Sequence, residues 1–178
     1  MRARMVLLIA AVASGVVGAP GNVAAQKFGP ESKYLGVHVG FSGVGSATAL
    51  GVNGEMAYND KVSIGAWADT WSYGERLAFG GAFYDWDVRY IALAATGAYH
   101  FPVPSEPKLD PFAGLALGYY VVSTSGTGFS GVTYAGSSSR LFLGAFGGAR
   151  YALSNRTSGV VRIGFGSTTL TVGLDFKM

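Results

Sequence analysis

The residues best suited to acid–base chemistry are two histidines, His38 and His100, in a chain that contains no cysteine. An acyl-transfer or hydrolytic site would need one of them beside a nucleophilic serine and an acid. His100 has no His-x-Ser arrangement nearby, and the two histidines should lie well apart along the molecule. His38 is interpreted as a hydrogen-bonding residue. The sequence therefore predicts no catalytic residue and no enzyme.

Five charged residues lie in segments that are otherwise apolar or rich in glycine: Glu55, Asp69, Arg150, Arg162 and Asp175. Such a set could form either an ion path or a network of opposite charges. An unpaired buried ion is expensive, so these residues must be fully paired wherever they are enclosed. We predict a structural network of paired charges inside the molecule.

Metal and phosphate sites receive little support. Asp85 and Asp87 could form a cation site with Asp110, but Asp110 is assigned to a turn on the opposite side of the molecule. The glycine-rich stretch GVGSATALG, near Gly43, precedes a strand pattern and not the helix that a phosphate-binding loop requires. We predict neither a metal nor a cofactor.

Alternation of apolar residues with small or polar ones organises the chain after Gln26, and no window has sustained helical spacing. Eight alternating segments emerge, each about as long as the ~9–11 residues of a tilted transmembrane strand. Between about Asp87 and Phe101 the facing of Arg89 stays open, because a bulge near Ala94 would reverse it. The other apolar faces are Leu35, Val37, Val39 and Phe41; Leu50, Val52, Met56 and Tyr58; Val62, Ile64, Ala66 and Ala68; Leu115, Leu117, Tyr119 and Val121; Leu141, Leu143, Ala145 and Tyr151; Val161, Ile163 and Phe165; and Leu170, Val172, Leu174 and Phe176.

The first 25 residues have the form of an export signal. Arg2 and Arg4 precede an uncharged apolar run from Met5 to Val17, and small residues at 23–25 suit cleavage. The apolar run is shorter than the ~20 residues of a membrane-spanning helix. We predict a signal peptide, residues 1–25, and one domain, residues 26–178.

Charge is sparse outside the signal. Charged residues make up 13% of the chain, against roughly 25% in an average soluble domain. Cleavage would remove two arginines and lower the formal net charge from +3 to +1. Because no cluster of Lys and Arg remains, we predict no nucleic-acid partner.

Two kinds of connection separate the segments. Short turns are expected at Asn59–Lys61, Pro102–Asp110 and Ser154–Arg156, and long loops at Ser72–Trp86 and Ser123–Ser139. Short turns on one side and long loops on the other are typical of outer-membrane barrels, with the turns in the periplasm. We therefore predict an all-β fold, an eight-stranded antiparallel up-and-down transmembrane β-barrel, with both ends on the turn side.

The positions of the lysines indicate which face meets lipid. None of Lys27, Lys33, Lys61, Lys108 and Lys177 lies inside a proposed strand, although a soluble barrel would carry such residues on its exterior. An arginine or lysine facing lipid costs about 2–4 kcal/mol at the bilayer midplane. We predict that the charged face lines the lumen, where eight strands leave room only for side chains.

Aromatic residues are expected to form two belts at the membrane surfaces. The periplasmic belt would contain Tyr58, Tyr99, Phe101, Tyr151 and Phe176. The outer belt would contain Trp71, Tyr73, Trp86 and Tyr119.

Two stretches, DPFAGLALGYY at 110–120 and TVGLDF at 171–176, resemble the small eight-stranded outer-membrane barrels, which include the OmpA transmembrane domain, OmpX and porin-like small barrels. The resemblance covers Tyr34 to Phe176. It implies that Phe176 is the aromatic signal read by the barrel-assembly machinery, although Lys177 and Met178 follow it here.

The resemblance also implies an exported, integral outer-membrane protein of a Gram-negative-type bacterium, in contact with outer-membrane lipid. We predict a non-enzymatic role, structural or in surface contact, with the outer loops binding other surface proteins. One alternative is a carrier of small apolar molecules, similar to OmpW, with an apolar outer half of the lumen near Trp67 and Phe142. Another is a lipid-modifying enzyme, since lipid A deacylases and palmitoyltransferases share the architecture. In that case His38 would meet Ser63, Glu55 or Asp175 across the lumen.

Overall fold

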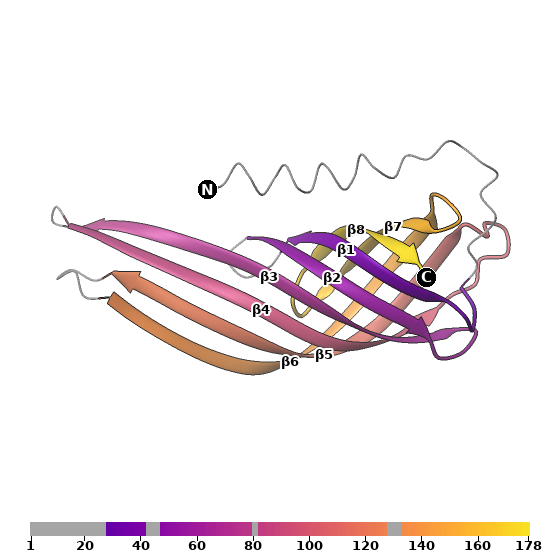
Figure 1. The fold of residues 1–178 in the computed structure, drawn as a ribbon, viewed down its shortest axis with the longest axis horizontal. Helices are drawn as coiled ribbons and strands as arrows, with labels where there is room; N and C mark the ends of the chain where they lie inside the picture. Colours follow the sequence, from indigo (N-terminus) through magenta and orange to yellow (C-terminus); the bar gives the residue numbers. More distant parts are fainter. Residues whose placement is uncertain (1–27, 42–46, 80–81, 128–132) are drawn as a thin grey trace.

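Eight antiparallel strands pair in sequence order and close into a barrel through a final pairing of β1 with β8 (Figure 1). The computed structural model describes residues 28–41, 47–79, 82–127 and 133–178, so the signal predicted for residues 1–25 lies outside them. The strands are β1 Lys33–Phe41, β2 Thr48–Ala57, β3 Val62–Phe79, β4 Ala82–His100, β5 Leu109–Thr127, β6 Thr133–Ala152, β7 Thr157–Phe165 and β8 Leu170–Lys177. The predicted fold class, an eight-stranded antiparallel up-and-down barrel, is confirmed.

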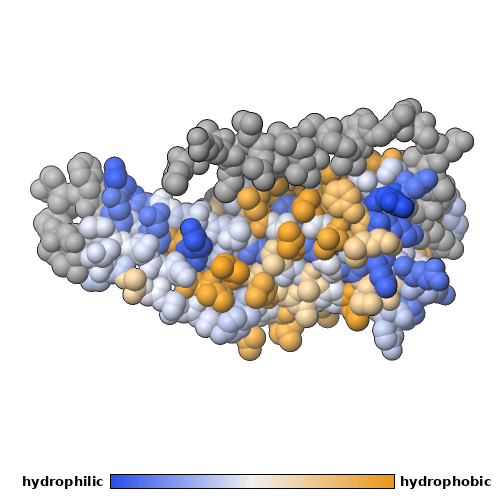
Figure 2. All heavy atoms as spheres, in the orientation of Figure 1, coloured by the Kyte–Doolittle hydropathy of each residue, from blue (hydrophilic) through white to orange (hydrophobic). Residues whose placement is uncertain are grey.

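The apolar residues of each strand face outward and the polar ones inward, as the alternation predicts. Leu143 on β6 is 75% exposed and Ile163 on β7 is 64% exposed, whereas Arg150 is 2% exposed. Figure 2 shows hydrophobic residues gathered over the middle of the barrel, with hydrophilic residues towards both ends. Each apolar side chain left in water would cost about 1.5–3 kcal/mol, so this exterior suits hydrocarbon.

The connections after β2, β4 and β6 lie at one end of the barrel, which is called the turn end below. At the first, the Asn59 side-chain oxygen accepts hydrogen bonds from the backbone N–H groups of Lys61, at 2.9 Å, and Val62, at 2.8 Å. At the third, the Ser154 hydroxyl accepts from the N–H groups of Arg156 and Thr157. Asn and Ser favour turns because of such local bonds. The short turns predicted at these two places are confirmed.

Beyond the opposite end of the barrel, β3 to β6 continue as a protruding sheet, made of residues 71–79, 82–90, 122–127 and 133–138 (Figure 1). The pairing of β2 with β3 ends at Thr70, so nine residues of β3 pass beyond it. At about 3.3 Å per residue they reach roughly 30 Å further. The long loops predicted at Ser72–Trp86 and Ser123–Ser139 are therefore wrong, because most of these residues pair as strands. The alternation persists through both stretches, although the residue types change.

The fourth strand pairs with β5 without interruption from Asp85 to His100, so no bulge lies near Ala94. Arg89 consequently shares the outward face with Leu93 and Tyr99 and is exposed. The turn predicted at Pro102–Asp110 extends too far along the chain. Because β5 begins at Leu109, Asp110 belongs to a strand of the barrel.

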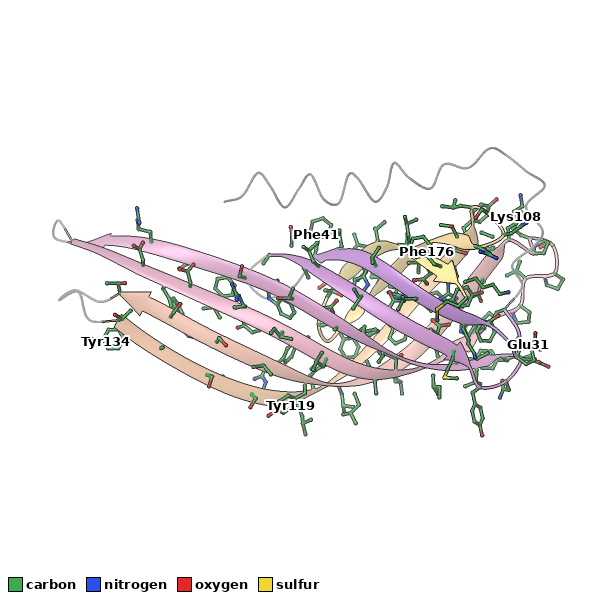
Figure 3. All side chains as sticks on the ribbon, viewed as in Figure 1. Glu31, Phe41, Lys108, Tyr119, Tyr134 and Phe176 are labelled. Carbon is green, nitrogen blue, oxygen red and sulfur yellow. The ribbon has the colours of Figure 1, made fainter. Side chains whose placement is uncertain are left out.

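The aromatic belt at the turn end contains Tyr58, Tyr99, Phe101 and Tyr151, all exposed. The predicted outer belt is correct only for Tyr119, which is exposed near the start of the protruding sheet, as is Phe41 (Figure 3). Trp71, Tyr73 and Trp86 lie on the inward face instead. The alternation of β3 requires this, since Trp71 lies two residues after the inward-facing Asp69 on the same strand. Among the residues described, no helix is long and apolar enough to span a membrane.

Candidate functional site

A buried arginine holds three carboxylates together in the lumen near the turn end. Arg150 on β6 donates from Nε to Asp175 Oδ2, from Nη1 to Asp110 Oδ2 and from Nη2 to Glu55 Oε2, each at 2.9 Å. The ring of Tyr34 covers the guanidinium, with its centroid 4.0 Å from Cζ. Three strands thus supply the acids and a fourth the base, so the contacts tie distant parts of the wall together.

A second group of polar side chains lies deeper in the barrel and joins the first through Asn53. The Asn53 amide donates to Asp175 Oδ1 at 3.0 Å, so its oxygen is left to accept from His38 Nδ1 at 3.1 Å. His38 Nε2 lies 2.6 Å from Asp69 Oδ1. Both ring nitrogens of His38 thus lie beside oxygen atoms. Arg162 reaches Asp175 at 3.7 Å.

Acidic and basic side chains are paired in the described lumen. Four acids, Glu55, Asp69, Asp110 and Asp175, face four basic side chains, His38, His100, Arg150 and Arg162. Each acid has a basic partner within 4 Å, as buried ions require. The structure therefore brings together all five residues singled out in the sequence, as two linked groups: Asp69 pairs with His38, Arg150 pairs with Glu55 and Asp175, and Arg162 joins them through Asp175.

Inward-facing glycines make room for these contacts. A Cβ added at Gly51 would collide with both Asp69 Oδ1 and His38 Nε2, and one added at Gly36 would collide with Asp175 and Asn53. Gly54, on the outer face of the same strand as Gly51, has no atom within 4 Å of an added Cβ. Glycine on the lumen face is thus required by the charged groups opposite it.

His100, and not His38, meets a serine and an acid. Its Nε2 lies 3.0 Å from Ser63 Oγ and its Nδ1 lies 2.8 Å from Asp110 Oδ1, in the order of a hydrolytic triad. Ser63 is only 1% exposed, and β3 pairs with β2 and β4 on both sides of it. These ladders occupy the backbone N–H groups that an oxyanion hole would need. The arrangement therefore acts as part of the buried charge network.

The expectation that His38 meets Ser63, Glu55 or Asp175 is wrong, since its ring contacts Asn53 and Asp69. The reason is axial position: β2 and β3 place Asn53 and Asp69, and not Glu55 and Ser63, beside His38. Asp110 and His100 were missed as members of the network. Parity could have found Asp110, because it shares the inward face of Phe112.

Phe28 closes the lumen at the turn end. Its ring stacks on His100 with centroids 3.6 Å apart and planes 4° from parallel, and the side chain is buried. The Ser32 carbonyl accepts from Ala57 N–H at 2.8 Å, which anchors the segment that carries Phe28 to the end of β2. Above this cap, the cavities beside His38 and Trp67 measure about 20 and 10 Å³. Each has room for about one water molecule.

The protruding sheet reverses the polarity of the barrel. Its outer face carries Ser72, Arg76, Asp85, Asp87, Arg89, Ser123, Ser125, Ser137 and related polar residues. Its inner face carries Trp71, Tyr73, Trp86, Val88, Tyr90, Val122 and Tyr134. A polar outer face is what strands require when they pass from hydrocarbon into water. The inner face, by contrast, is rich in aromatic residues. Figure 3 places Tyr134 at the far tip of the sheet, and Glu31 and Lys108 at the turn end.

No protein-family model matches the sequence, and no curated protein matches it. Solved structures do match the fold. The N-terminal β-barrel domain of Pseudomonas aeruginosa OprF has a TM-score of 0.60 at 13% identity, covering 84% of this chain and 99% of that one. Ail of Yersinia pestis, solved with the heparin analogue sucrose octasulfate, has a TM-score of 0.54 at 10% identity, covering 83% and 99%. Neisserial surface protein A has a TM-score of 0.52 at 15% identity, covering 83% and 95%. The chain has the fold of the small eight-stranded outer-membrane β-barrels.

Proposed function

We propose that the protein is a non-enzymatic outer-membrane barrel that contacts molecules outside the cell through its protruding sheet. The turn end lies in the periplasm, and the sheet stands in the external medium. The observation that supports this most strongly is the polar outer face of the sheet, roughly 30 Å beyond the point where β2 stops pairing with β3. A barrel that served only to fill the membrane would not need this extension.

The two side edges of the sheet suit contact with another chain. Within the described residues no strand pairs with β3 beyond Thr70 on its β2 side, or with β6 before Ala145 on its β7 side. Such edges present unpaired N–H and C=O groups and can accept an added strand. Within the sheet the open edge of β6 covers residues 133–138, which is the length of an ordinary strand.

Ail was solved with a polyanionic sugar analogue, but the charges of this protruding sheet suit a different partner. The sheet carries three acids, Glu75, Asp85 and Asp87, and two arginines, Arg76 and Arg89. Arg76 and Asp85 form an exposed ion pair. The guanidinium of Arg76 lowers the pKa of Asp85, and Asp85 in turn raises the pKa of Arg76. With no basic excess, the sheet has no electrostatic reason to collect polyanions.

Shortening the sheet tests this function. Asn-Gly turns joining Thr70 to Ile91 and Val121 to Ser139 would remove the protrusion and leave the membrane part intact. We expect the shortened protein to keep its heat-dependent gel shift and its surface level. Bacteria that produce it should lose the adhesion to cultured cells and to each other that the full-length protein confers. Equal adhesion by the two strains would refute a contact role for the sheet.

The alternatives have weaker support. A carrier of apolar molecules would need a path through a lumen whose cavities beside His38 and Trp67 hold about one water each. A lipid-modifying enzyme would need an accessible nucleophile, and Ser63 is buried. Planar-bilayer conductance would support the first, and a mass shift of lipid A upon expression, or labelling of Ser63 by a fluorophosphonate, would support the second.

Assembly is proposed to depend on the last strand. Phe176 pairs with Leu35 of β1 and with Thr157 of β7, and so lies where the barrel closes. We retain the proposal that the barrel-assembly machinery reads this aromatic residue, with outer-membrane lipid as the other constant partner of the barrel.

A further inference from the structure

We infer that the inner face of the protruding sheet binds a neutral oligosaccharide built of pyranose rings. This inference rests on the proposed function only in placing the sheet outside the cell. Its starting point is two large aromatic side chains exposed beyond the membrane part of the barrel, Trp86 at 45% and Tyr134 at 57%. Exposed aromatic residues on lipid-facing strands need no explanation, but in water they indicate a binding surface.

Trp86 and Tyr134 flank Gly126 on the inner face of the protruding sheet. Trp86 pairs with Gly126, and Gly126 pairs with Tyr134, so the three residues lie side by side across β4, β5 and β6 on the inner face. Two strand spacings, about 10 Å, separate the two aromatic residues. A Cβ added at Gly126 would lie 3.8 Å from Trp86 Cδ1, so the glycine lets the indole lie close to the sheet. The two exposed rings therefore offer faces on which flat rings can stack.

Sugars suit such a surface because of the charge distribution of the rings. The face of an aromatic ring is electronegative, and one face of a pyranose presents several weakly polarised C–H groups to it. Hydroxyl groups at the edge of the sugar then need polar partners. Glu75 lies in the same row as Trp86, and Thr124 and Ser138 lie in the next two rows. The face thus combines stacking with hydrogen bonding, as sites for polar ligands do.

The inner face is packed with aromatic rings nearer the barrel. Trp71 and Tyr90 stack with centroids 5.0 Å apart and planes 2° from parallel, and Tyr120 stacks on Phe142 at 4.4 Å. The buried Trp71 keeps an indole N–H without an acceptor among the described residues. A pre-ordered site loses less entropy on binding a ligand.

Other occupants fit less well. A purely apolar ligand would leave Glu75, Thr124 and Ser138 without partners. An added protein strand would use the edges of the sheet and not its inner face. A sulfated or phosphorylated polysaccharide would find no excess of basic residues, because Arg140 at the base of the sheet only balances the acids.

The test uses the purified full-length barrel in detergent micelles on an array of neutral and sulfated glycans, with heparin as the polyanion. We expect neutral pyranose glycans to bind, and Trp86→Ala and Tyr134→Ala each to weaken binding about tenfold. Trp86→Phe should retain most of the binding. Ser125→Ala, next to Gly126 but on the outer face, should leave it unchanged. The heat-dependent gel shift confirms that each variant is folded.

No binding to neutral glycans, equal binding by Trp86→Ala, or stronger binding to heparin than to every neutral glycan would overturn the inference. The outcome is separable from that of the proposed function. Adhesion that depends on the sheet without any glycan binding would refute only this inference. Glycan binding in micelles without adhesion in cells would refute only the proposed contact role.

Discussion

Replacing Arg150 with methionine should destabilise the barrel more than any other single change to the lumen. The side chain is 2% exposed and donates to Glu55, Asp110 and Asp175. Removing one partner of a buried ion pair costs about 3–5 kcal/mol, and three carboxylates depend on this one, so we expect the upper part of that range. The assay is equilibrium unfolding in urea of barrels refolded into lipid vesicles, followed by gel shift.

A compensating change makes the reasoning specific. Without Arg150, His100 still contacts both Asp110 and Glu55, and Arg162 still approaches Asp175, so three acids share two basic side chains. The double variant Arg150→Met, Glu55→Gln should therefore recover about 0.5–3 kcal/mol, the usual coupling within one network. Arg89→Met, on the exposed outer face, is the matched control and should change stability by less than about 0.5 kcal/mol. An unchanged Arg150→Met midpoint, or a double variant less stable than the single one, would refute the account of the network.

Three further changes test other parts of the structure. Gly51→Ala should cost about 1–3 kcal/mol because its methyl group would separate His38 from Asp69, whereas Gly54→Ala on the same strand should be nearly neutral; equal unfolding midpoints would contradict this packing. Phe28→Ala should increase hydrogen exchange at the end of β2, where its segment is anchored, while Phe28→Leu should do so less. Phe176→Ala should lower the yield of folded barrel in cells without changing refolding in vesicles; a parallel loss in both assays would indicate a structural role and not a recognition signal.

The sequence is sufficient for the architecture because the rule is local. One face of every strand meets lipid, so a period of two reveals the facing of each residue and the inward position of the charges. The same rule places Asp110 and Trp71 inward, and assignment of the first to a turn and of the second to a lipid-facing belt came from composition and not from parity. Polar and aromatic residues in a row suggest a loop, although here they form strands with water on one side.

Pairing inside the lumen could not be derived in the same way. Whether His38 or His100 meets Ser63 depends on the axial stagger between strands, and the alternation does not contain this quantity. Along β5 the outward-facing residues change from Leu117 to Ser123 at constant period, and we infer the edge of the membrane from this change. That boundary was visible in the sequence as a change of residue type at constant period.

Spin-label accessibility along β5 tests the central claim, that hydrocarbon surrounds the barrel and water surrounds the protruding sheet. The chain has no cysteine, so single cysteines can be labelled cleanly. In vesicles, labels at Leu115 and Leu117 should collide most with oxygen, which concentrates in lipid, and labels at Ser123 and Ser125 with a water-soluble nickel complex. A label at Ala116 should be shielded from both. Oxygen collisions that peak at Ala116, or nickel collisions at Leu115 as frequent as at Ser125, would contradict the account.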